Sequence, residues 1–294
     1  MSQSFDVSII GAGKVGTALA LLLRRRGCRI VSVISRRRAS AQRAAALVGC
    51  HNFSRRISNL HPATDFLLLA TPDESIQSVA HEVSLTASLD FSRLYVAHTS
   101  GMRTSDELDA LKRRGASTFS FHPIQTFPQG ASPATQLRSM DGVTYGVEGS
   151  QRAIRFARQL AGRLGGNVLR VPKKEKISYH LACVFASNYS VALLGAVEEL
   201  ARGFSPVPRL RPFRRLIQSS VDNAITLSAE KAMTGPIARG STQSVLMHLR
   251  VLGKNHRDLE MLYKILALHT LRLIARNKTI TPRRAAELRK ILAL

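Results

Sequence analysis

Two histidines stand directly after short apolar segments and could hold or transfer a proton. His98 follows residues 94–97, and His122 follows residues 118–121. Imidazole titrates near neutral pH, so either side chain could hydrogen-bond a carbonyl and shuttle its proton. Either one could instead only bond neighbouring backbone or shape a turn. The residues beside these histidines that we expect to contact substrate, together with His98, are Thr99, Ser100 and Gln125.

A second set of polar groups repeats at helical spacing further along the chain. Lys176 and His180 are four residues apart, and Asn188 lies two more steps of four along, so the three share one helix face. With His122, we expect Lys176 and His180 to be acid–base groups, and Asn188 to orient the substrate. The alternatives are a solvated lysine, a core histidine and an amide that bonds another helix.

An arginine lies in an unusual connecting segment, Thr234–Gly240, which reads TGPIARG. Its two glycines permit backbone angles that other residues avoid, and Arg239 could hold a substrate carboxylate or phosphate through paired hydrogen bonds. We therefore expect Arg239 to contact an anionic substrate. A structural corner between two helices is the alternative.

A glycine-rich turn near the start of the chain is typical of a dinucleotide site. It follows the apolar segment 6–10 and precedes the apolar segment 17–23, which is the strand–turn–helix context that gives G-x-G-x-x-G its meaning. There the positive end of the helix dipole faces a pyrophosphate. The expected cofactor-binding residues of this turn are Gly11, Ala12, Gly13, Lys14, Val15 and Gly16.

The end of the next predicted strand indicates which dinucleotide binds. An NAD site usually has a carboxylate there, but this strand ends in Ser35, Arg36 and Arg37. Guanidinium groups form bidentate hydrogen bonds with phosphate, so the sequence favours the 2′-phosphate of NADP(H). The tight turn after a third strand should pass under the nicotinamide ribose, and it adds Ala70, Thr71 and Pro72 to the expected cofactor contacts.

Strands and helices alternate in the first half, which predicts an α/β fold with a doubly wound, mostly parallel Rossmann sheet. From residue 174 onward the pattern is helical, without strand signals. We therefore predict an NADP-binding domain over residues 1–166 and an all-helical domain for substrate and dimerisation over residues 167–294. The predicted strands cover residues 7–10, 29–34, 66–70, 94–97, 118–121 and 144–147.

Composition favours a cytoplasmic protein that carries an arginine-rich surface. The 294 residues include 43 Lys plus Arg against 19 Asp plus Glu, but the basic residues are dispersed and aromatics are only 5%, so we expect no specific nucleic-acid partner. No leader segment and no apolar run of membrane-spanning length is evident, so we expect no membrane partner. The three cysteines are far apart, without metal spacing, so no metal site is expected.

Nearly the whole chain resembles the Rossmann-like proteins with a C-terminal DUF2520 domain. These are related to 6-phosphogluconate dehydrogenase-like proteins, to pyrroline-5-carboxylate reductase-like proteins and to F420-dependent NADP oxidoreductase-like proteins. The resemblance implies an NADP-linked fold and a homodimer through the helical domain, and it names no substrate. Ser241 stands where such proteins often carry Asp. The matching segments are 10–16, 70–73, 98–101, 121–127, 179–182, 187–189 and 234–240.

Together these features predict an NADP(H)-dependent oxidoreductase. We expect hydride transfer to or from a small, anionic oxo or imino compound that lies in a cleft between the domains. One alternative is a non-catalytic NADP-binding sensor or scaffold protein. Another is a reaction like that of prephenate dehydrogenases, or an F420-linked NADP reductase.

Overall fold

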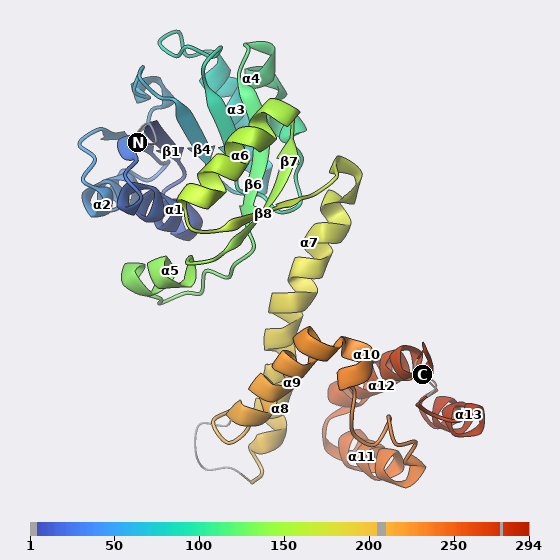
Figure 1. Ribbon diagram of the computed structural model, residues 1–294. Coiled ribbons are helices and arrows are strands. Elements are labelled where there is room, and N and C mark those ends of the chain that lie inside the picture. The colour runs from blue at the N-terminus through green and yellow to red at the C-terminus, as the bar shows by residue number, and fades with distance from the viewer. Residues whose placement is uncertain (1–4, 205–209, 277–278, 294) are drawn as a thin grey trace. The chain divides into compact units, whose positions relative to one another are not determined.

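An eight-stranded sheet forms the centre of the first part of the chain (Figure 1). The computed structural model describes residues 5–204, 210–276 and 279–293. The strand order is β3-β2-β1-β4-β5-β6-β7-β8, and neighbours run parallel except for the antiparallel pair β6 and β7. The strands are β1 (Asp6–Ile10), β2 (Arg29–Ile34), β3 (Phe53–Ser54), β4 (Phe66–Leu69), β5 (Tyr95–His98), β6 (Ser117–Pro123), β7 (Thr144–Gly149) and β8 (Asn167–Arg170).

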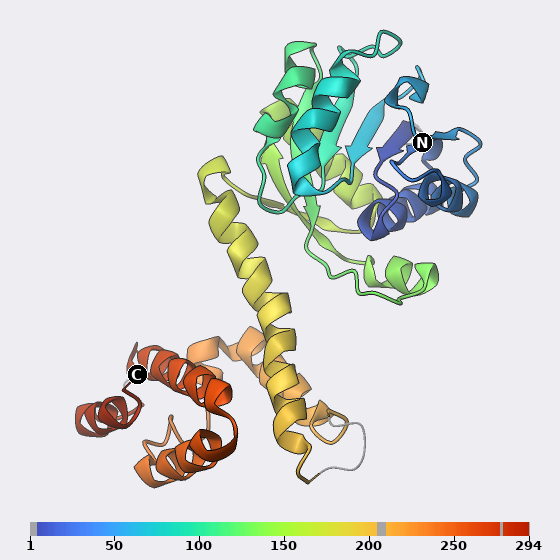
Figure 2. The same ribbon diagram turned by 180° about the vertical axis from the view of Figure 1, so that it is seen from behind.

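Helices cover both faces of this sheet, which confirms the predicted doubly wound α/β architecture. One buried cluster joins the sheet to α1, α2 and α6, and a second cluster on the other face joins it to α3 and α4 (Figures 1 and 2). The helices of this part are α1 (Lys14–Arg25), α2 (Arg38–Val48), α3 (Ile76–Ser84), α4 (Asp109–Arg113), α5 (Pro133–Ser139) and α6 (Gln151–Arg163).

Strand β4 shows why the sequence folds as a buried parallel strand. Its four residues read Phe-Leu-Leu-Leu and all are buried. Successive side chains of a strand point to opposite faces, so Phe66 and Leu68 join the first cluster while Leu67 and Leu69 join the second. A strand covered by helices on both faces is continuously apolar for this reason.

The chain divides into two units, Met1–Tyr189 and Ser190–Leu294. The first unit extends past residue 166, where the sequence suggested a boundary. Helix α7 (Lys176–Val184) causes this difference, because the side chain of Lys176 bonds Ser120 of β6 and that of Tyr179 bonds His122. The residues that could act from this helix therefore belong to the same unit as the sheet.

The second unit is helical, as predicted. A π-helical turn, Phe185–Tyr189, continues α7 into α8, and Ile237, Val245, Leu271 and Leu288 lie in the core of the unit. The helices are α8 (Ser190–Ala201), α9 (Arg214–Leu227), α10 (Ala229–Ala232), α11 (Thr242–Asn255), α12 (Arg257–Arg276) and α13 (Pro282–Ile291).

Candidate dinucleotide and reaction site

The glycine-rich turn joins β1 to α1, as the sequence predicted, and close packing requires two of its glycines. Gly11 has φ of +106°, and a Cβ on it would collide with the carbonyl oxygen of Ala70. A Cβ on Gly16 would collide with the carbonyl oxygen of Gly11. These glycines let the turn, the helix and the end of β4 approach one another.

Gly13 is different, because a Cβ on it would meet no protein atom within 4 Å. Its backbone is extended, with φ of −80° and ψ of −170°, a conformation open to any residue. It is the N-cap of α1, and no side chain caps that helix. The first N–H groups of α1 therefore face open space beside Gly13, where an anion can approach.

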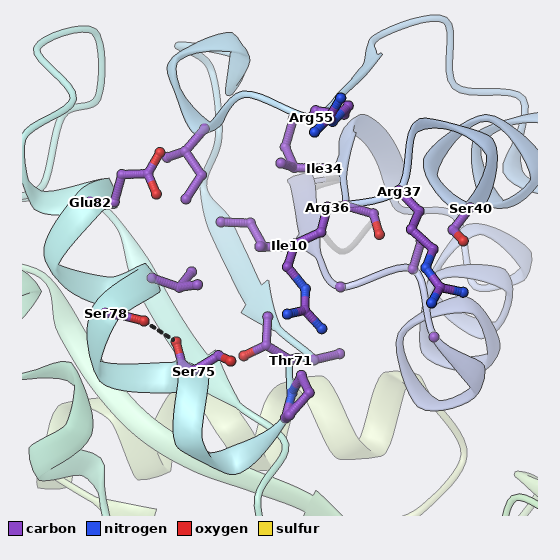
Figure 3. Close-up of a pocket in the computed structure, with 18 residues that line it drawn as sticks. Ile10, Ile34, Arg36, Arg37, Ser40, Arg55, Thr71, Ser75, Ser78 and Glu82 are labelled. Atoms are coloured by element: carbon purple, nitrogen blue, oxygen red, sulfur yellow. Dashed lines mark hydrogen bonds between the residues drawn. The ribbon is translucent and has the colours of Figure 1, made fainter.

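A pocket of about 810 Å³ begins at this turn (Figure 3). Arg36 extends into it toward Thr71, and Arg37 lies on the α2 side beside Ser40. In the described part of the chain, neither guanidinium has a carboxylate within ion-pair distance. The predicted cofactor residues that line this pocket are Gly11, Ala12, Gly13, Ser35, Arg36, Arg37, Ala70, Thr71 and Pro72.

Arg55, which the sequence did not single out for this site, also lines the pocket, near Ile34 (Figure 3). Arg55 directly follows β3, a strand of only two residues that carries no recognisable pattern. Glu82 of α3 also lines the pocket, at the side away from Arg36 and Arg37. The positive charge is thus concentrated where β2 and β3 end.

A second pocket of about 550 Å³ continues from the first along the carboxyl ends of the strands. Both pockets share Gly13, Ala70, Thr71 and Pro72. Ligands of open α/β sheets bind at this edge. The predicted residues that line only the second pocket are Lys14, Val15, Thr99, Ser100, His122, Gln125 and His180.

The residues present fit a dinucleotide, by two independent observations. The first is the open space that a side chain at Gly13 would fill. The second is Thr71, which lines both pockets and whose buried hydroxyl has no hydrogen-bond partner among the described residues. Buried polar groups are normally satisfied, so this hydroxyl is available to hydrogen-bond a dinucleotide that occupies the pockets.

His122 and His180 come together at the second pocket. Their ring centroids lie 6.4 Å apart, and both rings lie against Gly101, because a Cβ there would stand 2.7 Å from His180 Cδ2 and 3.0 Å from His122 Nε2. Burial and, to a lesser extent, the positive charge of Lys176 lower the pKa of His122 to about 4. The imidazole of His122 is therefore neutral at neutral pH.

Lys176 lies beneath the second pocket rather than in its lining. Its side chain is 1% exposed, and Nζ donates to Ser120 Oγ at 2.8 Å and to the carbonyl oxygen of Ser100 at 3.3 Å. Burial lowers the pKa of Lys176 to about 8, while the carboxylates of Glu148 and Asp73 oppose this shift. The ammonium group supports the loop that carries Ser100.

His98 is fully buried, and the structure does not bring it into either pocket. Its Nε2–H donates to the carbonyl oxygen of Thr104 at 2.9 Å, and Nδ1 accepts from the N–H of Ser100 at 3.2 Å. Burial lowers its pKa to about 4. With both nitrogens bonded to backbone, His98 holds the loop that follows β5.

The two remaining predicted contacts lie outside the pocket linings. Asn188 sits in the π-helical turn, where its side-chain oxygen lies 2.9 Å from Ser187 Oγ. Arg239 is exposed in the second unit, and its carbonyl oxygen lies 3.5 Å from Arg284 Nη1. A role for either residue toward a substrate stays a prediction.

Among the described residues, no three His, Cys, Asp or Glu side chains gather as a metal site would require.

The buried histidines predict that stability falls with acid. An unfolded histidine binds a proton near pH 6.5, whereas His98 and His122 resist protonation until about pH 4. The free energy of unfolding should therefore fall as the pH drops from 6.5 to 4, by about 3 kcal/mol for His98 and by less for the half-buried His122. Urea unfolding at several pH values measures this. The His122→Asn variant should show a shallower dependence, and an unchanged slope would contradict the assignment.

Known proteins show the same two-part organisation. Residues 2–123 match the model of a Rossmann-like domain, and residues 143–270 match the domain of unknown function DUF2520. No protein with a curated description matches the sequence. A crystal structure described as an NADP oxidoreductase from Bacteroides fragilis is 22% identical, with a TM-score of 0.74 over 91% of this chain and 98% of that one.

Two further solved structures share the fold at lower identity. An imine reductase from Myxococcus stipitatus, in complex with NAD+, is 14% identical, with a TM-score of 0.63 over 97% of this chain and 99% of its own. Prephenate dehydrogenase from A. aeolicus, in complex with hydroxyphenyl propionate and NAD+, is 15% identical, with a TM-score of 0.57 over 93% of this chain and 99% of its own. The chain is thus a Rossmann-like and DUF2520 domain-containing protein, as its motifs led us to expect.

Proposed function

We propose that this protein is an NADP(H)-dependent oxidoreductase that acts on a small, anionic oxo or imino compound. The observation that carries the proposal is the continuous pair of pockets, which leads from the glycine-rich turn to His122 and His180. Solved structures with this fold include an imine reductase and a prephenate dehydrogenase. The direct test is NADPH oxidation measured over a panel of oxo acids and imines.

Different residues at the carboxyl ends of the strands would bind different parts of the cofactor and the substrate. The turn at Gly11–Gly16 would hold the pyrophosphate. The hydroxyl of Thr71, which lines both pockets, would donate a hydrogen bond to the dinucleotide. NADP(H), when bound, supplies the hydride donor or acceptor at its nicotinamide. His122 and His180 would hydrogen-bond the oxo or imino group of the substrate from the Gly101 side of the second pocket.

The arginines support NADP(H) over NAD(H). Arg36 and Arg37 bring two positive charges to the first pocket, and Arg55 adds a third. The acidic residue Glu82 lies away from Arg36 and Arg37. A 2′-phosphate placed among these guanidinium groups would gain charge-assisted hydrogen bonds.

Removing the charges of Arg36 and Arg37 should reverse the preference for NADPH over NADH. Each hydrogen bond to a charged group contributes about 1.5–3 kcal/mol, less at an exposed site, so Arg36→Gln/Arg37→Gln should raise the Kd for NADPH about 100-fold. The Kd for NADH should stay within about threefold. The control Arg113→Gln/Arg158→Gln removes the same charge from exposed positions outside both pockets. An equal loss in the control would mean that net charge, and not these two residues, attracts NADPH.

A non-catalytic NADP-binding sensor is the alternative from another class. His122 and His180 at the second pocket favour an enzyme, because a sensor needs only the first pocket. A reaction on a prephenate-like substrate or with F420 would use the same second pocket, and the substrate panel distinguishes these cases by adding an aromatic hydroxy acid and reduced F420.

We also propose that a second copy of the chain covers the long apolar helix. Among the described residues, one helix, Lys173–Ala201, is long and apolar enough to cross a membrane, by length and composition only, and none of its most apolar window is buried. Its first turns, however, bond to the sheet through Lys176 and Tyr179, which disfavours a lipid-embedded position. Ile177 and Leu181 are 69% and 50% exposed on it. Light scattering on the whole chain should give the mass of a homodimer.

We propose that the protein is located in the cytoplasm. Cys28, Cys50 and Cys183 are all free, and the first two are buried. Thiols that stay unpaired are typical of a reducing compartment.

A further inference from the structure

A partly buried hydrogen bond joins His122 to Tyr179 of α7, a residue that the proposed function has not used. His122 Nδ1 lies 2.7 Å from the phenol oxygen of Tyr179, and the two rings meet edge to face. The sheet makes room for the phenol at Gly146 of β7, where a Cβ would collide with the Tyr179 hydroxyl. The ammonium of Lys176 lies over the tyrosine ring, 5.5 Å from its centroid. Contacts from β6, β7 and α7 thus surround the phenol next to the imidazole.

The direction of this hydrogen bond depends on the tautomer of His122. Burial raises the pKa of Tyr179 far above its usual value, and the neighbouring Cys183 raises it further, so the hydroxyl keeps its proton. A protonated phenol can donate one hydrogen bond and can also accept one, and a neutral imidazole has one donor and one acceptor nitrogen. When Tyr179 donates to Nδ1, the ring proton of His122 must sit on Nε2.

The Nε2 edge of the His122 ring lies next to Gly101, a residue of the second pocket. A Cβ on Gly101 would lie 3.0 Å from Nε2, and both Gly101 and His122 line that pocket. The absence of a side chain at Gly101 therefore lets this segment of the pocket lining approach the Nε2 edge closely. An imidazole held in this tautomer presents an N–H donor to the pocket rather than a lone pair.

We propose that Tyr179 is a positioning residue that fixes His122 as the Nε2–H tautomer, so that His122 offers a neutral hydrogen-bond donor to the substrate. The oxo or imino nature of the acceptor rests on the proposed function. The tautomer itself does not, because it concerns only the hydrogen bond between His122 and Tyr179, and NMR measures it without a substrate. Tyr179 acts through His122 and is not placed in the pocket lining.

The tautomer can be measured directly by NMR on the whole chain with 15N-labelled histidine. His98 is an internal reference, because a carbonyl oxygen faces its Nε2 and an N–H faces its Nδ1, which fixes the Nε2–H form. The His122 signals are assigned as those missing from the His122→Asn spectrum. We expect His122 to show the same tautomer as His98. In Tyr179→Phe, which removes one oxygen atom, we expect a mixture of both tautomers for His122 and no change for His98.

Either of two results would overturn the proposal: an Nδ1–H tautomer for His122 in the unaltered protein, or an unchanged tautomer in Tyr179→Phe. The control Tyr189→Phe changes an exposed tyrosine ten residues further along the same helical segment and should alter neither histidine. In turnover assays, Tyr179→Phe should lower kcat about tenfold and leave the Kd for NADPH unchanged. If no oxo or imino compound is turned over, the proposed function fails, while the NMR result still decides the role of Tyr179.

Discussion

Gly13→Val should abolish NADPH binding and leave the fold intact. The extended backbone at Gly13 accepts a β-branched residue, and its Cβ would meet no protein atom within 4 Å. The valine methyl groups would instead fill the space where the pyrophosphate approaches the first N–H groups of α1. We expect the Kd for NADPH to rise at least about 100-fold. The free energy of unfolding should change by less than about 0.5 kcal/mol.

Two other glycines serve as controls for this variant. Gly162 in α6 also has open space around a built Cβ, but it lies outside both pockets. Gly162→Ala should therefore leave NADPH binding unchanged and raise the free energy of unfolding by up to about 1 kcal/mol, because alanine favours a helix more than glycine does. Gly16→Val should unfold or strongly destabilise the first unit, because its Cβ collides with backbone. Calorimetric titration and urea unfolding measure the two quantities. Normal NADPH affinity in Gly13→Val would place the cofactor elsewhere.

His122→Asn should lower turnover by about 10²- to 10⁴-fold, the range that general acid–base groups contribute. His122 lines the second pocket beside His180 and does not line the first, so the Kd for NADPH should stay within about twofold. Asparagine keeps a polar side chain next to Tyr179. Steady-state kinetics with the best substrate from the oxo-acid and imine panel, together with an NADPH titration, measure the two effects separately.

An exposed histidine gives the matched control. His81 lies on α3, outside both pockets, so His81→Asn should retain full turnover. Unchanged kcat in His122→Asn would remove His122 from the chemistry. NADPH binding without turnover of any compound in the panel would favour the sensor over the enzyme.

The fold was predictable because its signals are local. The Phe-Leu-Leu-Leu run of β4, the glycine turn at Gly11–Gly16 and the loss of strand patterns after β8 each depend on neighbouring residues in the chain. Strand β3 was missed because two residues are too few for a pattern, and Arg55 was missed with it.

The site was predictable only in part, because hydrogen-bond partners come from distant segments. His98 and His122 look alike in sequence, since each follows a short apolar segment, yet one bonds only backbone and the other faces a pocket. Helical spacing grouped Lys176 with His180 but could not show that Ser100 and Ser120 hold the lysine beneath the pocket. Tyr179 lies three residues after Lys176 on the same helix. That spacing could have indicated it, but its partner His122 is 57 residues away in the sequence.

The most direct test of the central claim is a titration of the unaltered protein with NADPH and with NADH under the same conditions. The two pockets and the arginines at the first one predict a single saturable site per chain, with NADPH bound at least about tenfold more tightly than NADH. Equal affinities, or tighter binding of NADH, would contradict the assignment of Arg36 and Arg37 to a 2′-phosphate. No binding of either dinucleotide would contradict the proposed function as a whole.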